Sequence, residues 1–346
     1  MSRPLARVAL AVGAIVATLG MSACGGDTHA ASSPATVVRL GYFPNLTHGT
    51  AIVADKEGFF SKHLGSTKLQ VSTFNAGPSA IEALKSGAID ATYVGPGPAT
   101  NAFINSGGQA LTIVAGAATG GTSLVVDPSI RSAADLRGKK VSTPQLGNTQ
   151  DIALRYWLRQ HGLKADLQGG GDVSILPQDN AQILDAFRQR LIAGAWVPEP
   201  YATRLVQAGG KVLVDERDLW PGKKFAITVL AVRTDFLTEH PKTVTALLSG
   251  DLDATDFIAR EPAKAQRDVA DVIATVSGKP LKPAVIAAAW KQLDFTADPV
   301  SSSLLLGAQH AYQVGVLTKK PQLEKLVDLS LLNQLLKARG KPEVVR

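Results

Sequence analysis

The sequence predicts an α/β protein made of two lobes of related topology, and three observations support this fold class. Short β-rich runs alternate with helical segments from residue 37 onward, which is the pattern of βαβ units and a mainly parallel sheet. The alternation begins again near residue 140. In addition, residues 81–99 (IEALKSGAIDATYVGPGPA) are echoed by residues 184–202 (LDAFRQRLIAGAWVPEPYA), as expected of two related α/β units.

The expected elements follow from the hydrophobic pattern and from the Gly, Pro and Asn residues between segments. In the first half, helices are expected at 46–57, 78–85 and 98–105, between strands at 37–43, 69–74, 89–94, 111–114 and 122–126. In the second half, helices are expected at 149–160, 181–188 and 201–207, between strands at 140–142, 173–176, 195–197, 212–214 and 225–232. After Thr234 the pattern is almost entirely helical.

The internal echo aligns element with element. Each copy runs from a helix through a turn and a short strand to a Pro-x-Pro that opens another helix, and Tyr93 is aligned with Trp196. Gly87 suits the left-handed end of a helix, whereas its counterpart is Arg190, so the second turn lacks that residue. Two divergent copies are too few for a solenoid and fit two related lobes.

The N-terminus has the pattern of an export signal. Arg3 and Arg7 precede an apolar run at 8–19, which is too short to cross a bilayer. The following Met-Ser-Ala-Cys24 resembles a bacterial lipobox, although its methionine departs from the usual leucine. We expect a signal peptide at 1–23, a lipid on Cys24 and a flexible tether at 24–36. The alternative is an ordinary signal peptide with an incidental cysteine.

Composition narrows the class of protein further. The formal net charge is +7, but Lys and Arg are scattered and no basic run is interleaved with aromatic residues, which argues against nucleic-acid binding. The chain has a single cysteine, so an exported form has no internal disulfide and depends on a large core. We expect a monomer.

Catalytic and metal-binding signatures are missing from the sequence. It contains no G-x-S-x-G elbow and no H-E-x-x-H motif, and its six histidines are scattered without metal-ligand spacing. No pair of acids stands in a context that marks general acid–base chemistry. We therefore expect no catalytic residue, no metal site and no cofactor.

Four loops between predicted strands and helices form the candidate ligand site. Ligands of open α/β sheets bind beyond the carboxyl ends of the strands, where helix N-termini present free N–H groups to anions. The alternative is ordinary turn and cap chemistry. The loops are Phe43–His48, Asn75–Ser79, Gly95–Pro98 and Gln145–Thr149.

Individual side chains leave alternatives open. His48 could donate to an oxyanion or be a solvated surface residue. Asn45 and Gln145 are uncharged donors and acceptors that could orient a ligand without a fixed charge. Trp196 beside Glu199 could be a stacking platform with a polar partner, or a core residue beside a helix cap. Tyr93 is more consistent with the core.

Four stretches together carry a family resemblance over about residues 38–340. The chain resembles the nitrate, aliphatic-sulfonate and taurine group of ABC-transporter substrate-binding proteins, with their thiamine-precursor-binding relatives. The stretches are LGYFPNLTHGTAIVADKEGFF (40–60), FNAGPSAIEALKSGAIDATYVGPGPATNAF (74–103), LRGKKVSTPQLGNTQDIALRYWL (136–158) and AWVPEPYATRL (195–205).

The resemblance implies a two-lobe periplasmic-binding-protein fold (type II, Venus flytrap) with two crossover strands, near 117–127 and 218–230, and a helical C-terminal tail. Lobe 1 would comprise 37–120 plus 228–346, and lobe 2 would comprise 121–227. The implied ligand contacts are Asn45, Thr47, His48, Gly77, Ser79, Gly95, Pro96, Gln145, Asn148, Trp196 and Glu199.

The implied function is solute capture outside the cytoplasm, by lobe closure that the permease subunits of an ABC importer and their ATPase recognise. A small sulfonate-type anion is the expected ligand. A carboxylate of Glu199 in the cleft would instead favour a zwitterion such as taurine or a cationic pyrimidine. Rival classes are a sensor or interaction module without transport, and an enzyme on the same scaffold.

Overall fold

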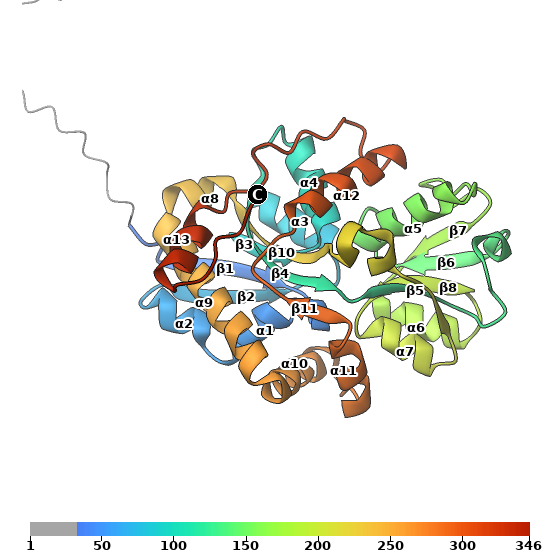
Figure 1. Cartoon of the computed structure of the whole chain (residues 1–346), viewed down its shortest axis with the longest axis horizontal. Coiled ribbons are helices and arrows are strands. Elements are labelled where there is room, and N and C mark those ends of the chain that lie inside the picture. Colours follow the sequence, from blue (N-terminus) through green and yellow to red (C-terminus); the bar gives the residue numbers. More distant parts are fainter. Residues whose placement is uncertain (1–32) are drawn as a thin grey trace, which may run out of the picture. The chain divides into compact units, whose positions relative to one another are not determined.

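The computed structural model describes residues 33–346, and these residues form two α/β lobes, each built around its own sheet (Figure 1). This arrangement confirms the predicted fold class. The predicted signal peptide, Cys24 and most of the predicted tether lie outside the described residues. Within residues 33–346, no helix has both the length and the apolar character needed to cross a membrane.

Lobe 1 contains a six-stranded mixed sheet with the order β11-β4-β10-β3-β1-β2. Strand β1 is parallel to β2 and β3, whereas β10 runs antiparallel to β3 and β4, and β11 antiparallel to β4. The strands are β1 (Val37–Tyr42), β2 (Lys68–Thr73), β3 (Ala91–Val94), β4 (Leu111–Gly120), β10 (Ala226–Arg233) and β11 (Leu293–Phe295).

Lobe 2 contains a five-stranded mixed sheet with the order β7-β6-β8-β5-β9. Strand β6 is parallel to β7 and β8, and β5 is antiparallel to β8 and β9. The strands are β5 (Thr122–Val126), β6 (Lys140–Thr143), β7 (Ser174–Pro177), β8 (Gly194–Pro198) and β9 (Lys211–Asp215).

The two sheets share one topology. The order β4-β10-β3-β1-β2 in lobe 1 corresponds strand by strand to β9-β5-β8-β6-β7 in lobe 2. In the echoed segment, Tyr93 on β3 is paired with Leu230, and Trp196 on β8 is paired with Leu124. The sequence echo therefore marks equivalent positions in two related lobes.

The helices begin just beyond the parallel strands, as predicted, and the tail adds six more (Figure 1). Lobe 1 has the 3₁₀ turn η1 (Leu46–His48), α1 (Gly49–Lys56), α2 (Phe59–Leu64), α3 (Gly77–Lys85) and α4 (Pro96–Asn105). Lobe 2 has η2 (Ala133–Leu136), α5 (Thr149–Gln160), α6 (Asn180–Arg188) and α7 (Tyr201–Gln207). The tail has α8 (Thr234–Glu239), α9 (Pro241–Arg260), α10 (Pro262–Ser277), α11 (Pro283–Trp290), α12 (Ser301–Gln313) and α13 (Ser330–Ala338).

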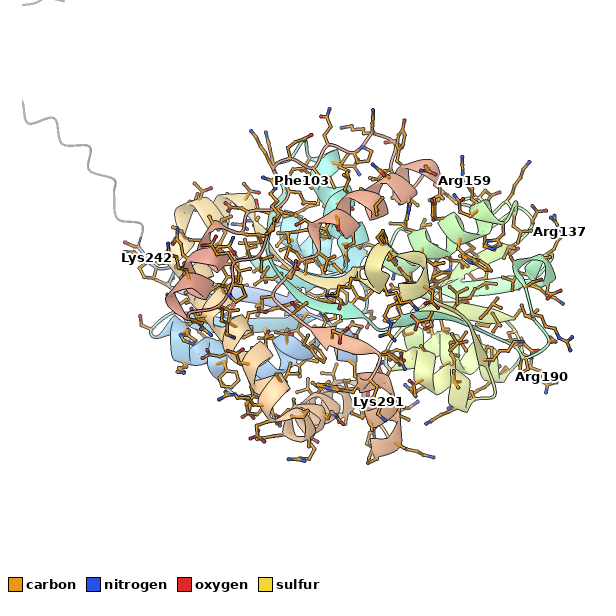
Figure 2. All side chains as sticks on the ribbon, viewed as in Figure 1. Phe103, Arg137, Arg159, Arg190, Lys242 and Lys291 are labelled. Atoms are coloured by element: carbon orange, nitrogen blue, oxygen red, sulfur yellow. The ribbon has the colours of Figure 1, made fainter. Side chains whose placement is uncertain are left out.

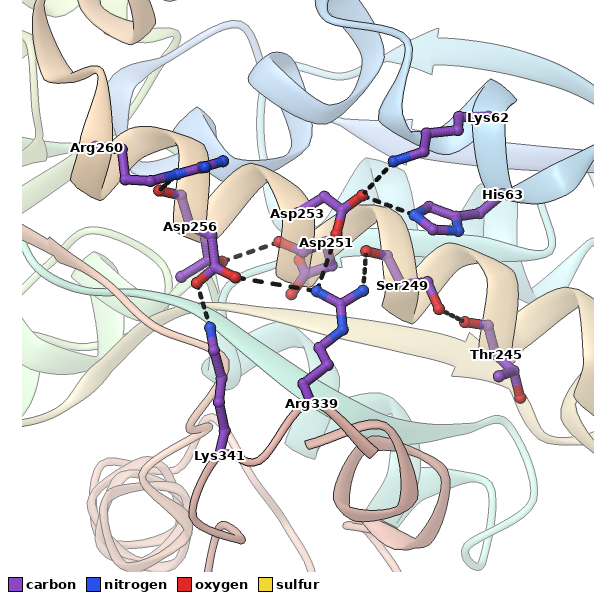
Figure 3. A network of polar contacts seen from close by, with 11 residues as sticks. Lys62, His63, Thr245, Ser249, Asp251, Asp253, Asp256, Arg260, Arg339 and Lys341 are labelled. Carbon is purple, nitrogen blue, oxygen red and sulfur yellow. Dashed lines mark hydrogen bonds and ion pairs between the residues drawn. The ribbon is translucent and has the colours of Figure 1, made fainter. Parts of the chain in front are cut away.

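Ion pairs and packing hold the helical tail together and join it to lobe 1. Helix α9 packs on α1 and α2, and α13 packs on α9. Just after α13, Arg339 Nη1 lies 2.9 Å from Asp253 Oδ1 of α9, and Lys341 pairs with Asp256 (Figure 3). Asp253 also accepts from Lys62 of α2 (Figure 3).

The chain changes sheet at two places. The first is Gly120–Gly121, between β4 and β5, where both residues have positive φ. Two close contacts explain the small residues, because a Cβ at Gly120 would lie 2.8 Å from the Gln292 carbonyl oxygen and a Cβ at Gly121 would lie 2.2 Å from a methyl group of Leu293. The second is the connector from β9 to β10, which contains the 3₁₀ turns η3 (Glu216–Leu219) and η4 (Pro221–Lys223). Strand β10 belongs wholly to the sheet of lobe 1.

Two details differ from the expectation. The prediction of a mainly parallel sheet is wrong. The two strands that follow the crossovers, β10 and β5, each pair antiparallel with both of their neighbours. The tail also contains β11, which has only three residues and pairs with β4. A strand this short shows no periodicity in the sequence.

Basic side chains are spread over the outside of both lobes. Arg137 and Arg190 lie toward the far end of lobe 2, Lys242 lies at the opposite end of the molecule, and Lys291 follows α11 (Figure 2). These four basic residues therefore lie far apart on the surface. Arg190 itself has a φ of 58°, in the left-handed region that its counterpart Gly87 also occupies with a φ of 73°.

Candidate functional site

A small cavity lies between the two lobes, and loops from both lobes line it. Its free volume is about 30 Å³, room for a compact group only. No Lys, Arg, Asp or Glu lines it, so a ligand meets polar and apolar neutral groups only. The lining residues are Phe43, Asn45, Thr47, His48, Asn75, Ala76, Gly77, Gly95, Pro98, Pro144, Asn148, Thr149, Gln150, Asn180, Pro198 and Ile227.

The four predicted loops all contribute to this cavity. Each follows the carboxyl end of a parallel strand and leads into η1, α3, α4 or α5, and α6 adds a fifth helix start through Asn180. The first N–H groups of a helix have no partner within the helix and lie at the positive end of its dipole. The wall is therefore electropositive without a single formal charge.

His48 is a neutral hydrogen-bond donor. The residue is 2% exposed, and its ring stacks on Phe43 with 4.2 Å between ring centroids. The Phe43 N–H donates to His48 Nδ1 at 3.2 Å, so the ring proton is on Nε2. Burial lowers the pKa of His48 to about 3, which keeps the imidazole uncharged at physiological pH.

Asn45 and Thr47 form a second polar pair in the wall. Both are buried, and the Thr47 hydroxyl donates to Asn45 Oδ1 at 2.6 Å. Asn45 has an extended backbone (φ −144°) at the start of η1. The hydroxyl bond leaves the Asn45 amide nitrogen for a ligand.

Asn148 connects the lobe 2 side of the cavity to its helix. It is the N-cap of α5, and its Oδ1 accepts the Asp151 N–H at 2.9 Å. Its Nδ2 donates to Gln150 Oε1 at 3.0 Å. Gln150 is 5% exposed and lines the cavity, so its remaining amide hydrogens are available there.

Two glycines are needed for close approach. A Cβ at Gly77 would lie 2.3 Å from Pro98, and a Cβ at Gly95 would lie 2.4 Å from the Thr149 hydroxyl of lobe 2. Beside them, the Gly97 N–H donates to Thr149 Oγ1 at 3.2 Å. The absence of side chains at Gly95 and Gly97 therefore allows the start of α5 in the other lobe to contact the start of α4 next to the cavity.

Three of the predicted contacts lie in neighbouring spaces. Ser79 and Gln145 line a polar cleft outside the cavity, which shares Asn75 with it and also includes Asp179. The Asn75 amide lies 3.5 Å from Asp179 across the lobes. Pro96 lines a separate apolar cavity against α12.

Trp196 and Glu199 lie away from the cavity wall. Trp196 is fully buried in lobe 2, where its Nε1 donates to Glu216 Oε2 at 2.6 Å. Glu199 accepts from the Thr203 N–H at 3.1 Å and from its hydroxyl at 3.0 Å, so it caps the first turn of α7. The predicted stacking platform is therefore a core residue beside a cap, and neither residue lines this cavity.

Sequence reasoning missed several lining residues that lie outside the four loops. Gln150 follows a predicted loop by one residue and reads as an ordinary helix position. Asn180 opens α6, a helix start that the sequence offers without a Gly-rich loop. Pro198 begins the Pro-x-Pro of the second echo copy, and no local signal marks Pro144 and Ile227.

Among the described residues, no group of three or more His, Cys, Asp or Glu side chains is placed to hold a metal ion. His48 is the only titratable side chain among the lining residues. The chemistry that this wall offers is hydrogen-bond donation to a compact, electron-rich group.

Comparison with known proteins places this geometry in a family. The taurine-binding periplasmic protein of Escherichia coli is 29% identical over 207 residues, covering 59% of this chain and 61% of that protein. The alkanesulfonate-binding protein SsuA of Xanthomonas axonopodis superimposes with a TM-score of 0.70 at 21% identity, covering 86% of this chain and 99% of that chain.

The nitrate-binding protein NrtA of Synechocystis superimposes with a TM-score of 0.72 at 19% identity, covering 89% of this chain and 90% of that chain. These superpositions show that the fold is that of periplasmic binding proteins. Residues 31–274 match the NMT1-like family over more than half of the chain. The chain therefore belongs to the NMT1-like family.

Proposed function

We propose that this chain is the extracytoplasmic solute-binding component of an ABC importer and that it binds a small sulfonate-type anion between its lobes. The observation that carries the proposal is a cavity lined by helix N-termini and neutral N–H donors, without any charged side chain. Such a wall solvates an anionic oxygen through aligned dipoles. The proposal is one of binding without catalysis.

Family membership supports the transport role. Relatives and fold neighbours are named for binding taurine, nitrate and alkanesulfonates, all of which carry a compact oxyanion. Closure of the two lobes around the solute would present a surface to the permease subunits and their ATPase. The separation of donors between lobe 1 (Asn45, His48) and lobe 2 (Gln150) suits a ligand that stabilises closure.

The position of Glu199 argues against a cationic ligand. Its carboxylate caps α7 and does not line the cavity, so the residue on which a zwitterion or a pyrimidine cation would depend is engaged elsewhere. A purely anionic group is therefore the better fit for the interior.

We also propose that Cys24 anchors the protein to the outer face of the cell membrane. The support is the lipobox-like run before Cys24 and the small polar tether after it. In cells fed a labelled fatty acid, the wild-type chain should carry label and the Cys24→Ser variant should not. Equal labelling of the two chains would contradict the anchor.

Isothermal titration with methanesulfonate and nitrate tests the ligand proposal. We expect saturable 1:1 binding, and a ligand at 100 times its Kd should stabilise the fold by about 2.7 kcal/mol. His48→Phe keeps the ring and removes the donor, and it should weaken binding at least about tenfold. Glu199→Gln is the matched control and should bind as wild type does. Absence of binding to every anion tested would refute the proposal.

A further inference from the structure

Helix α12 of the tail contacts both lobes. It packs against α4 of lobe 1 and against α5 of lobe 2 (Figure 1). Its attachment is to lobe 1, because the Ala226 N–H of β10 donates to Ser303 Oγ at 3.0 Å, and Leu304 and Ala308 belong to the large apolar cluster of that lobe. The contacts between α12 and α5 are therefore contacts between the lobes.

Two specific contacts join α12 to α5. The imidazole of His310 stacks on the ring of Tyr156, with 3.6 Å between ring centroids and 13° between the ring planes. Three residues further along each helix, Arg159 Nη1 donates to the Gln313 carbonyl oxygen at 2.7 Å. Gln313 is the last residue of α12, where carbonyl groups lack a partner within the helix and the helix dipole favours a cation. We call these two contacts the α12 latch.

The latch also closes an apolar space between the lobes. A cavity with a free volume of about 30 Å³ lies between α4, α5 and α12, and His310 lines it together with Trp220 of the connector. The ring centroids of these two residues are 5.5 Å apart. Burial lowers the pKa of His310 to about 4, so the imidazole is uncharged at physiological pH. Separation of α12 from α5 would expose the apolar lining to water, which is unfavourable.

The position of the latch relates it to the ligand cavity. Helices α4 and α5 begin on opposite walls of that cavity, where the Gly97 N–H donates to Thr149 Oγ1 at 3.2 Å. A solute enters the space between the lobes when these two helix starts move apart. Because α12 is attached to lobe 1, α5 leaves α12 when it leaves α4. The latch contacts therefore belong to the closed arrangement of the lobes.

We propose that the α12 latch stabilises the closed arrangement and thereby sets the affinity for the solute without touching it. The inference rests on the proposed function only in placing a solute between the lobes. The apparent association constant is the intrinsic constant multiplied by the fraction of the protein in the binding-competent arrangement. An aromatic pair or a hydrogen bond should change that fraction about two- to tenfold. Tyr156, Arg159 and His310 are thus positioning residues.

Variants of the lobe 2 partners test the latch. Tyr156→Ala removes the stacked ring and Arg159→Ala removes the donor. Each should weaken the binding of methanesulfonate and of nitrate about two- to tenfold by titration calorimetry, and the two substitutions together should weaken it at least about tenfold. Stopped-flow tryptophan fluorescence should show this loss as faster release, because the latch breaks when the lobes open.

Two further variants serve as controls. Tyr156→Phe keeps the stacked ring and should bind as the wild type does. His161→Ala removes a comparable ring contact inside lobe 2, where His161 lies 4.4 Å from Trp157 between ring centroids, and it should leave the affinity unchanged. Loss of the latch is thereby distinguished from loss of any ring contact. Arg159 is exposed, so Arg159→Ala should fold even if Tyr156→Ala does not.

The outcomes separate this inference from the proposed function. Failure of both anions to bind the wild-type chain would refute the proposed function, and small-angle X-ray scattering of the solute-free chain then tests the latch alone. A larger radius of gyration in the Tyr156→Ala, Arg159→Ala double variant supports the latch, and equal radii overturn it. Where the anions do bind, equal or tighter binding by the double variant overturns the latch, since its contacts would then not favour closure.

Discussion

The two lobes place a large aromatic residue at the same point of the same topology and satisfy its polar atom with different segments. In lobe 1, the Tyr93 hydroxyl donates to Asp251 Oδ1 of α9 at 2.6 Å. In lobe 2, Trp196 Nε1 donates to Glu216 Oε2 at 2.6 Å, and Glu216 comes from the connector. The repeated fold thus keeps a large aromatic residue on the central strand of each lobe. The acid that accepts its hydrogen bond comes from a different segment in each lobe.

The lobes also differ in what stabilises them. In lobe 1, one large apolar cluster joins the sheet to the helical tail. In lobe 2, two smaller clusters lie on opposite faces of the sheet, as the alternation of Val125 and Leu124 between them shows. Because the apolar clusters of lobe 2 are smaller, we expect its stability to depend more on buried polar interactions, and the first substitution below tests this difference.

The largest effect is expected from the buried ion pair of lobe 2. Asp151 and Arg155 have side chains that are 0% and 1% exposed, and Arg155 Nε lies 2.9 Å from Asp151 Oδ2. Asp151→Ala leaves a buried, unpaired arginine and should lower the free energy of unfolding by about 3–5 kcal/mol. Urea unfolding monitored by tryptophan fluorescence measures this change.

A double variant provides the control for that prediction. Asp151→Ala with Arg155→Leu removes both charges and should recover part of the loss, because no buried charge is then left alone. If Asp151→Ala lowers the free energy of unfolding by less than the double variant does, the view that lobe 2 depends on this ion pair is contradicted.

The buried acids make the stability of both lobes depend on pH. Burial raises the pKa of Asp251 to about 7 and that of Glu216 to about 8. Each folded pKa lies above the unfolded value, so the contribution to stability is complete below the unfolded pKa and is lost as pH rises through the folded pKa. Stability should therefore fall by a few kcal/mol between acidic and mildly alkaline pH.

Replacing one acid at a time separates the lobes. Asp251→Asn keeps an acceptor for Tyr93 and should flatten the lobe 1 part of the pH profile. The lobe 2 part, due to Glu216 and to Glu199, whose pKa burial raises to about 7, should remain. Thermal unfolding across the pH range measures the slope of each profile. An unchanged profile in Asp251→Asn would show that this carboxyl does not titrate with folding.

Contact between the lobes offers the next test. A Cβ at Gly95 would lie 2.4 Å from Thr149 Oγ1 of lobe 2. If lobe closure accompanies binding, Gly95→Ala should weaken anion binding by at least about tenfold, since a clash at the closure contact must be relieved first. Adding Thr149→Ala removes the clashing hydroxyl and should restore part of the affinity. Titration of the Gly95→Ala, Thr149→Ala double variant against the two single variants measures the coupling free energy between these positions.

The fold was predictable where the pattern is repeated. Alternation of strands and helices, the echo of residues 81–99 in 184–202, and the loops at strand ends led to the two lobes and to Asn45, Thr47, His48 and Asn148. The antiparallel crossovers were missed, because the direction in which a strand enters a sheet depends on contacts distant in sequence.

For the same physical reason, sequence reasoning named residues that do not line the cavity and missed one that does. Trp196 and Glu199 stand beside a Pro-rich turn that resembles the lobe 1 loop, but their polar atoms are already engaged by Glu216 and Thr203. Gln150 has its amide N–H groups available to the cavity because Asn148 Nδ2 donates to its Oε1. Hydrogen-bond partners of this kind appear only when the side chains are placed in three dimensions.

The smallest effect is expected at the turn where the internal echo fails. Gly87 and Arg190 occupy equivalent positions with φ values of 73° and 58°, and only glycine adopts this conformation without steric cost. Arg190→Gly should raise the free energy of unfolding by up to about 1 kcal/mol, because relief of the left-handed strain exceeds the added freedom of the unfolded chain.

The converse substitution completes the comparison. Gly87→Ala in lobe 1 should destabilise by a similar amount, since it introduces the strain that Arg190 already carries in lobe 2. Thermal denaturation of the two variants measures both changes against wild type. Arg190 is exposed, so an ion pair there would contribute little. A loss of stability in Arg190→Gly would therefore mean that the flexibility of the unfolded chain outweighs backbone strain at this turn, and that the two lobes tolerate the same conformation for different reasons.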